Sequence, residues 1–244
     1  MRILLWLILI GLITNVAFTQ QKPEPQFKLV QFHMALLKKG SKWTATNTQE
    51  SASLHQQHIA YVTSLLESGK AMIAGPLTDD GEIRGVYIFR AQSAEEAKAW
   101  AEGDPAVAAG HLVAEMHPWW SEDVMKKPAS PIKLETAYLG FLTRGAKWTP
   151  EQSPVTEELQ KAHIANIQRL AAMKKLVVAG PFGDNGNLRG IFVFRVASLD
   201  EAKQLSATDP AVQAGRLVVD LHPWIGAGRS LALVKVSSLR SQDW

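Results

Sequence analysis

The chain contains no cysteine among its 244 residues. This absence excludes disulfide bonds, thiolate nucleophiles and cysteine-ligated metal sites. A strong excess of one charge is also absent, because 26 Lys and Arg residues stand against 23 Asp and Glu residues and the net charge is +3. The basic residues are scattered, so the sequence lacks the basic patch of a nucleic-acid-binding protein. Phosphate-binding loops, Gly-x-Ser-x-Gly elbows and dinucleotide-binding fingerprints are missing as well.

Long apolar runs are rare, and the one at the start of the chain is typical of a secretory signal. Arg2 precedes an apolar stretch over residues 3–13, and small residues, Ala17 and Thr19, occupy the −3 and −1 positions of a cut before Gln20. The run is short for a membrane span of about 20 residues. We therefore predict a signal peptide over 1–19, a linker over 20–26 and a secreted or periplasmic protein. The alternative is an uncleaved amphipathic or membrane anchor.

The chain also contains a long segment that occurs twice. Ala74-Gly75-Pro76 recurs as Ala179-Gly180-Pro181, and His117-Pro118-Trp119 recurs as His222-Pro223-Trp224, each 105 positions later without a gap. A repeat of this length suits two small domains and is too long for a solenoid unit. The predicted organisation is a first domain over 27–120, a linker over 121–131, a second domain over 132–225 and a tail over 226–244.

Each half is predicted to contain, in order, a strand, a helix, two strands, a helix and a last strand. In the first half these elements are expected over residues 27–37, 51–67, 70–74, 85–90, 93 onward and 112–116. Ser93 and Glu96 are expected to form a capping box at the second helix. Gly75-Pro76 is expected in a turn, and His117-Pro118 is expected to end the last strand. Residues 231–236 could form one added strand.

This order of elements favours an α+β fold in which an antiparallel sheet carries helices on one face, the ferredoxin-like arrangement. The strands over 86–89 and 191–194 are apolar on both sides, so the other face of each sheet also needs a cover. Packing the two halves sheet to sheet would bury both faces.

Several motifs together resemble the YCII-related domain family. They are the Ala-Gly-Pro turn, the Ser-x-x-Glu-Ala helix start, the Asp-Pro-Ala-Val-x-Ala-Gly segment and a histidine on the first helix, and they cover nearly everything between Phe27 and Trp224. The resemblance implies a ferredoxin-like fold of the dimeric α/β-barrel type, similar to muconolactone isomerases, here formed by one chain as a pseudo-dimer. It also implies a His–Asp active site, which would pair His58 with Asp104 and His163 with Asp209.

The residues themselves leave two interpretations of these pairs open. His58 and His163 lie in the apolar stripe of their helices, where a histidine is either an acid or base or a core residue bonded to a backbone carbonyl. Asp104 and Asp209 precede proline and are expected to cap a helical turn. A capping carboxylate keeps a lone pair that can orient an imidazole, so both roles are compatible.

Arg84 and Arg189 are candidate ligand-binding residues, because a guanidinium can hold a carboxylate through two hydrogen bonds. The alternative is that they pack over Trp43 or Trp148, which would either wall a ligand cavity or plug the edge of the domain.

Histidine spacing gives no recurring metal-ligand pattern. His33 and His111 are replaced by Tyr138 and Arg216 in the second half, and Gln160 replaces His55. We therefore predict neither a metal nor a cofactor.

The resulting functional hypothesis is an exported enzyme that performs proton transfer on a small carboxylate-bearing molecule, with the His–Asp pairs as acid or base. The alternatives are a binding module without chemistry and a structural or interaction protein without an active site. The expected partners are a small molecule and the chain's own second half, with further self-association possible, but neither nucleic acid nor membrane after signal cleavage.

Overall fold

The computed structural model describes residues 29–46, 48–123, 125–128 and 130–227. The predicted signal peptide, the linker over 20–26 and the possible strand over 231–236 lie outside these residues. Within the described ranges, no helix has the length and apolar character needed to cross a membrane.

Both halves have the same order of elements. The first half contains β1 (Leu29–Lys39), α1 (Gln49–Ser68), β2 (Ala71–Pro76), β3 (Ile83–Phe89), α2 (Ala94–Glu102), α3 (Pro105–Ala108) and β4 (Leu112–Glu122). The second half contains β5 (Leu134–Arg144), α4 (Pro154–Ala172), β6 (Leu176–Pro181), β7 (Leu188–Phe194), α5 (Leu199–Ser206), α6 (Pro210–Gln213) and β8 (Leu217–Ala227). Each half forms one antiparallel sheet, in the orders β2-β3-β1-β4 and β6-β7-β5-β8. The predicted α+β class and ferredoxin-like arrangement are confirmed.

The helix ends follow from local sequence. Thr48 caps α1 and exchanges hydrogen bonds with Ser51, and the left-handed backbone that closes this helix falls on Gly69 at φ 79°. Ser93 caps α2 through the backbone N–H of Glu96, as predicted. The Glu96 carboxylate, however, accepts from the backbone N–H of Gln92, so the expected box is only half formed.

Two predicted strand ends are wrong. β2 continues through Gly75 and Pro76, and β4 continues through His117-Pro118 as far as Glu122, two residues past the expected domain boundary. Proline is tolerated in β4 because this strand lies at the edge of its sheet. The carbonyl of Pro118 faces outward and accepts a hydrogen bond at 2.9 Å from the N–H of Gly183 in the other half.

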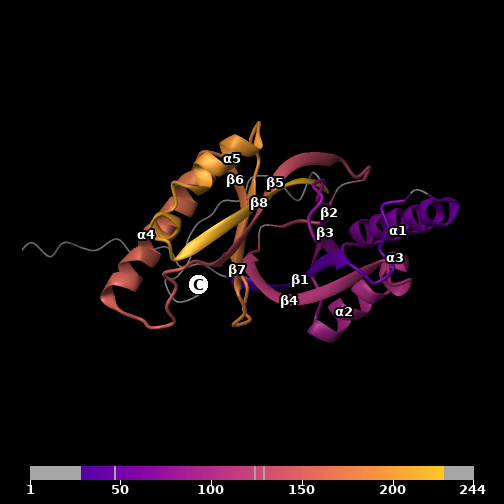
Figure 1. Cartoon of the computed structure of the whole chain (residues 1–244), viewed down its shortest axis with the longest axis horizontal. Helices are drawn as coiled ribbons and strands as arrows, with labels where there is room; N and C mark the ends of the chain where they lie inside the picture. The colour runs from indigo at the N-terminus through magenta and orange to yellow at the C-terminus, as the bar shows by residue number, and fades with distance from the viewer. Residues whose placement is uncertain (1–28, 47, 124, 129, 228–244) are drawn as a thin grey trace, which may run out of the picture.

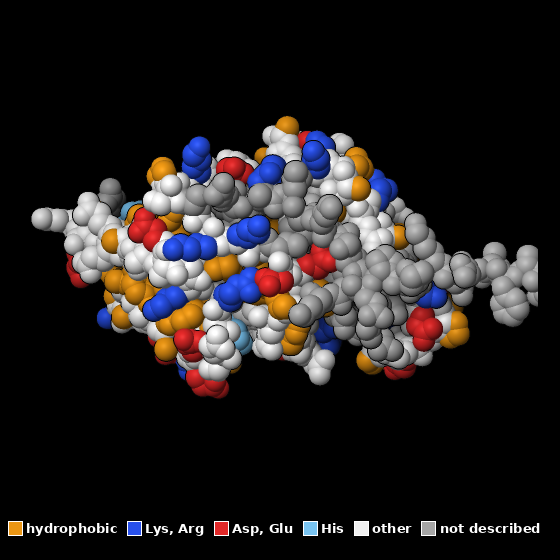
Figure 2. Space-filling model, turned by 180° about the vertical axis from the view of Figure 1, so that it is seen from behind, with side chains coloured by type: hydrophobic (Ala, Val, Ile, Leu, Met, Phe, Trp, Pro, Cys, Tyr) orange, Lys and Arg blue, Asp and Glu red, His pale blue; other side chains and the backbone are white. Residues whose placement is uncertain are grey.

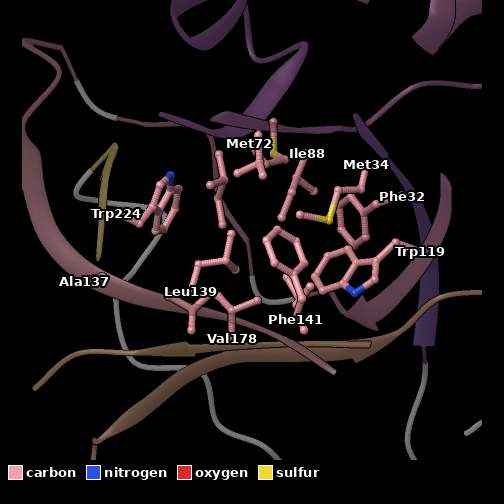
Figure 3. Packing of buried hydrophobic residues seen from close by; sticks show 14 of the residues in the cluster. Phe32, Met34, Met72, Ile88, Trp119, Ala137, Leu139, Phe141, Val178 and Trp224 are labelled. Carbon is pink, nitrogen blue, oxygen red and sulfur yellow. The ribbon is translucent and has the colours of Figure 1, made fainter. Parts of the chain in front are cut away.

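The two sheets face each other in the middle of the molecule, and the helices of each half lie on the outside (Figure 1). Between the sheets lies an apolar core drawn from both halves, in which Phe32, Met34 and Ile88 of the first sheet meet Leu139 and Phe141 of the second (Figure 3). Two further clusters fill the space between each sheet and its own helices. Both faces of each sheet are therefore buried, as the apolar strands predict.

The halves also meet at their strand edges. Trp119 Nε1 donates to the carbonyl of Gly180 at 2.9 Å, and Trp224 Nε1 donates to that of Gly75 at 3.0 Å. These glycines are needed for the close approach, since a Cβ at Gly180 would lie 2.0 Å from the carbonyl oxygen of Trp120. The two sheets thereby close into one barrel-like pseudo-dimer.

Candidate functional site

In the first half, His58 and Asp104 form a hydrogen-bonded pair. The Nδ1 atom of His58 lies 2.9 and 2.8 Å from the two carboxylate oxygens of Asp104. Asp104 is also the N-cap of α3, where its Oδ1 accepts from the backbone N–H of Ala106 at 2.9 Å. The capping and orienting roles that the sequence left open therefore belong to the same carboxylate.

Tyr87, which the sequence analysis did not select, completes this group. It projects from β3 and its hydroxyl donates to Asp104 Oδ2 at 2.5 Å. Burial, the charge of Asp104 and this hydrogen bond all raise the pKa of Tyr87, so its hydroxyl stays protonated. The fully buried Asp104 thus accepts from three donors, which compensates for the loss of water around its charge. A comparison of the two halves could have drawn attention to Tyr87, because the equivalent position of the second half holds Phe192.

The geometry fixes which nitrogen of His58 is available for chemistry. Because Nδ1 faces a carboxylate, it is the protonated nitrogen of the neutral ring, and Nε2 is left with the lone pair. No hydrogen bond joins Nε2 to another described residue. The His58 side chain is 18% exposed, whereas that of Asp104 is 0% exposed.

His58 lines a cavity of about 590 Å³ between α1, the loop that precedes it and β3. Its wall is mostly apolar, and its ionisable members are Arg84, His55, His58, His111 and Tyr87. Among the described residues, no Asp or Glu lines it. The described wall of the cavity therefore presents one guanidinium, three imidazoles and a phenol, but no carboxylate, to a ligand.

Arg84 and Trp43 also line this cavity, and the two interpretations given for them are compatible. The guanidinium carbon of Arg84 lies 5.3 Å from the centre of the Trp43 ring, and its Nη1 atom donates to the backbone carbonyls of Asp79 and Gly81. Trp43 is 37% exposed. Arg84 thus packs on the tryptophan as the hairpin interpretation expects, while both residues form part of the cavity wall.

The second half keeps the pair but buries it. His163 Nδ1 lies 2.8 and 2.9 Å from the oxygens of Asp209, and both side chains are 0% exposed. Asn166 Nδ2 donates to Asp209 Oδ2 at 3.3 Å. Phe192 replaces the tyrosine and stacks on the His163 ring at a centroid distance of 6.0 Å. The two pairs therefore share their geometry and differ in access.

Arg189 and Trp148, the remaining predicted ligand-binding residues, also lie together in the second half. The Arg189 guanidinium carbon is 4.8 Å from the centre of the Trp148 ring. Arg189 is only 9% exposed.

Two further histidines join the halves, a role that the sequence analysis missed. His117 Nδ1 lies 2.6 Å from Asp184, and the equivalent atom of His222 lies 2.6 Å from Asp79. The sequence contains a hint of these pairs, because His-Pro-Trp and the aspartate both recur 105 residues later. It does not show that each histidine bonds to the aspartate of the other half. In the described part of the chain, no group of three or more His, Asp or Glu side chains is placed to hold a metal ion.

Basic and acidic side chains are interspersed on the described part of the face in Figure 2, matching their scattered order in the sequence. The described part of this face therefore offers no extended surface of one charge.

Comparison with known proteins agrees with this architecture. "Uncharacterized protein YjpA" of Bacillus subtilis (strain 168) is 33% identical over 73 residues, which is 28% of this chain and 84% of that protein. The solved structure of a heme-binding protein from Thermus thermophilus aligns with 83% of this chain and over 93% of its own length, with a TM-score of 0.51 and 12% sequence identity. A chlorite dismutase variant from Candidatus Nitrospira defluvii covers 81% of this chain and 91% of its own, with TM-score 0.52 and 13% identity.

At such identities the structural likeness concerns the fold alone. The family model of the YCII-related domain matches residues 31–119 and 143–225, which is most of the chain and falls once in each half. The chain therefore belongs to the YCII-related domain family and carries two such domains in tandem.

Proposed function

We propose that the first half binds a small carboxylate-bearing molecule in the cavity beside His58 and transfers a proton to or from it. His58 acts as the acid or base, Asp104 orients it, and Tyr87 and the Ala106 N–H hold Asp104 in place. The observation that carries the proposal is the contact of His58 Nδ1 with both oxygens of a buried carboxylate, while His58 itself lines a cavity of about 590 Å³.

Proton transfer follows from the tautomer. With its proton on Nδ1, the neutral ring accepts a substrate proton at Nε2, and the resulting imidazolium is stabilised by the adjacent Asp104 carboxylate. The ring can then return the proton to another atom of the same molecule or to water. A positioned acid–base group of this kind contributes about 10²- to 10⁴-fold to a rate.

The charge of the cavity supports an anionic substrate. Arg84 lines it with a permanent positive charge, and none of the described residues in its wall is an Asp or Glu. The Nε atom of Arg84 is buried and has no hydrogen-bond partner among the described residues. A carboxylate placed near this guanidinium would gain a charge-assisted hydrogen bond, while the apolar wall would hold the rest of the molecule.

The second half is not assigned this chemistry. His163 is fully buried, and Phe192 stands where the first half has Tyr87. Asp209, which bonds to His163, also accepts a hydrogen bond from Asn166. A substrate would have to displace core side chains to reach this ring. The proposal therefore assigns His163 and Asp209 a structural role and makes them the matched control for the first half.

A proton-exchange experiment tests the proposal without knowledge of the full reaction. Small 2-oxo and 3-oxo acids, including pyruvate, 2-oxoglutarate and acetoacetate, would be incubated in deuterated buffer, and exchange at the acidic carbon followed by proton NMR. The wild-type chain should accelerate exchange for at least one acid. His58→Gln should reduce that acceleration by about 10²-fold or more, and His163→Gln should leave it unchanged.

Three results would count against the proposal. Binding without exchange would leave a binding module. Exchange that survives His58→Gln would place the chemistry elsewhere. A His58 ring whose NMR signals respond to none of the acids would remove the cavity as their site.

We also propose that the chain is exported, on the strength of the apolar run over residues 3–13 and the small residues before Gln20. Intact-mass measurement of protein from the native host should give a chain that begins near Gln20. A mass that includes Met1, or recovery in the membrane fraction, would contradict export with cleavage.

A further inference from the structure

Three arginines gather around Trp148 at the surface of the second half. Arg144 ends β5, Arg189 lies in β7 and Arg216 precedes β8. Their guanidinium carbons lie 5.5, 4.8 and 4.5 Å from the centre of the Trp148 ring. A cation–π contact with the indole stabilises a guanidinium at such a distance. Three guanidiniums that all lie this close to one ring also repel each other, because they carry the same charge.

No carboxylate among the described residues neutralises this cluster with an ion pair. Arg144 donates to the carbonyl of Asn185, Arg189 donates to that of Asp184, and Arg216 donates to the carbonyl and hydroxyl oxygens of Thr149. These acceptors are neutral. The Asp184 carboxylate is instead bonded to His117 across the interface at 2.6 Å.

Arg189 is the most deeply buried of the three arginines. It is nine-tenths buried, and its Nε atom is buried without a hydrogen-bond partner in the described part of the chain. Burial lowers the pKa of Arg189 most, and the nearby charge of Arg144 lowers it further against the opposing effect of Asp184. Burial also lowers the pKa of Arg216, opposed by Glu151.

We propose that Arg144, Arg189 and Arg216 form a binding site for an oxyanion, the carboxylate or phosphate group of a small molecule. Guanidinium groups match the geometry of such oxygens and bind them through paired hydrogen bonds. Arg144 is exposed, and Arg216 and Trp148 are half-buried, so a ligand can reach the cluster from solvent.

This site belongs to the second half specifically. Lys39, Arg84 and His111 stand at the equivalent positions of the first half, so the exchange of His111 for Arg216 adds a permanent charge. The inference uses none of the groups around His58. Its failure therefore leaves the proton-transfer proposal standing, and the reverse also holds.

Isothermal titration calorimetry of the full chain with inorganic phosphate and with malonate tests the proposal. At least one anion should bind in the micromolar to millimolar range, and the preference between them separates a phosphate site from a carboxylate site. Arg216→Gln should weaken binding about tenfold or more, the scale of one charge-assisted hydrogen bond. Arg216→Lys should lie between Arg216→Gln and the wild type, because an ammonium keeps the charge but not the paired donors.

Lys203→Gln is the matched control, since it removes one exposed positive charge from α5 of the same half. It should leave affinity unchanged. If Arg216→Gln fails to fold by circular dichroism, Arg144→Gln replaces it, because that side chain is exposed. The proposal is overturned if neither anion binds at millimolar concentration, or if the control weakens binding as much as the arginine variant.

Discussion

Replacement of Asp104 by asparagine should reverse the tautomer of His58 while preserving the helix cap. Asparagine caps helices about as well as aspartate, and its carbonyl oxygen can keep the hydrogen bond from Ala106 N–H. Its NH₂ group then occupies the place of Oδ2, beside His58 Nδ1 and the Tyr87 hydroxyl. A donor at that place favours an unprotonated Nδ1, which moves the ring proton to Nε2.

The cost to stability follows from the bonds that change. The three hydrogen bonds that Asp104 accepts have a charged acceptor and contribute about 1.5–3 kcal/mol each, whereas bonds to the neutral amide contribute about 0.5–1.5 kcal/mol each. Removing a buried charge recovers part of this loss. We therefore expect the free energy of unfolding to fall by about 1–3 kcal/mol, which leaves a folded protein. The proton-exchange rate should fall by about 10²-fold or more, because Nε2 can no longer accept a proton.

Two measurements check this prediction. Nitrogen-15 NMR of the histidine rings reports the tautomer directly, and urea unfolding reports stability. Asp209→Asn is the matched control, because Asp209 has the same contact with His163 and the same capping role in the second half. It should cost a similar amount of stability while leaving the His58 tautomer and the exchange rate unchanged.

The reasoning fails if Asp104→Asn folds normally and His58 keeps its proton on Nδ1. Asp104 would then be a helix cap only. An unchanged exchange rate with a reversed tautomer would separately remove His58 as the base.

Three other predictions concern a close backbone contact between the halves, the Lys38–Glu115 ion pair of the first sheet and the central core. Gly180→Ala should lower the urea midpoint by the equivalent of about 1–3 kcal/mol or more, because its Cβ would lie 2.0 Å from the Trp120 carbonyl oxygen. The control Gly81→Ala should change the midpoint little, because the nearest atom to its Cβ lies at 3.6 Å. Equal midpoints for the two variants would contradict the close approach. The hydrogen bond from Lys38, and then the charges of Lys38 and His117, lower the pKa of Glu115 below 4.5 against the effect of burial. A carboxyl whose pKa is lower in the folded state stabilises the protein at pH values above its unfolded-state pKa. Glu115→Gln should therefore lower the melting temperature at neutral pH, and this difference should vanish as the pH falls through the folded-state pKa of Glu115. A difference in melting temperature that persists in acid would refute this. A fragment of residues 27–120 exposes its half of the central core and should be a homodimer or insoluble by light scattering, whereas a soluble, stable monomer would refute the role of that core.

The sequence by itself determined the class of fold and much of the candidate site. The offset of 105 residues separated the halves, and apolar patterning on both faces of the strands required each sheet to be covered twice. The His58–Asp104 pair could be named because a family resemblance joined two residues that are 46 positions apart. Helix starts were also readable, since capping depends on residues within one turn.

Tertiary structure decided the strand ends, the access of each site and the junction. Local rules end a strand at proline, but β4 stays paired with β1 as far as Glu122, and the outward carbonyl of Pro118 accepts a hydrogen bond from Gly183 of the other half. His58 and His163 share the sequence His-Ile-Ala and the same contact with an aspartate, yet one lines a cavity and the other is sealed by Phe192 and its neighbours. The hydrogen bonds of His117 and His222 to the opposite half are equally invisible in the chain order. Each of these features depends on which distant surface packs against a residue, and the local pattern of the chain does not contain that information.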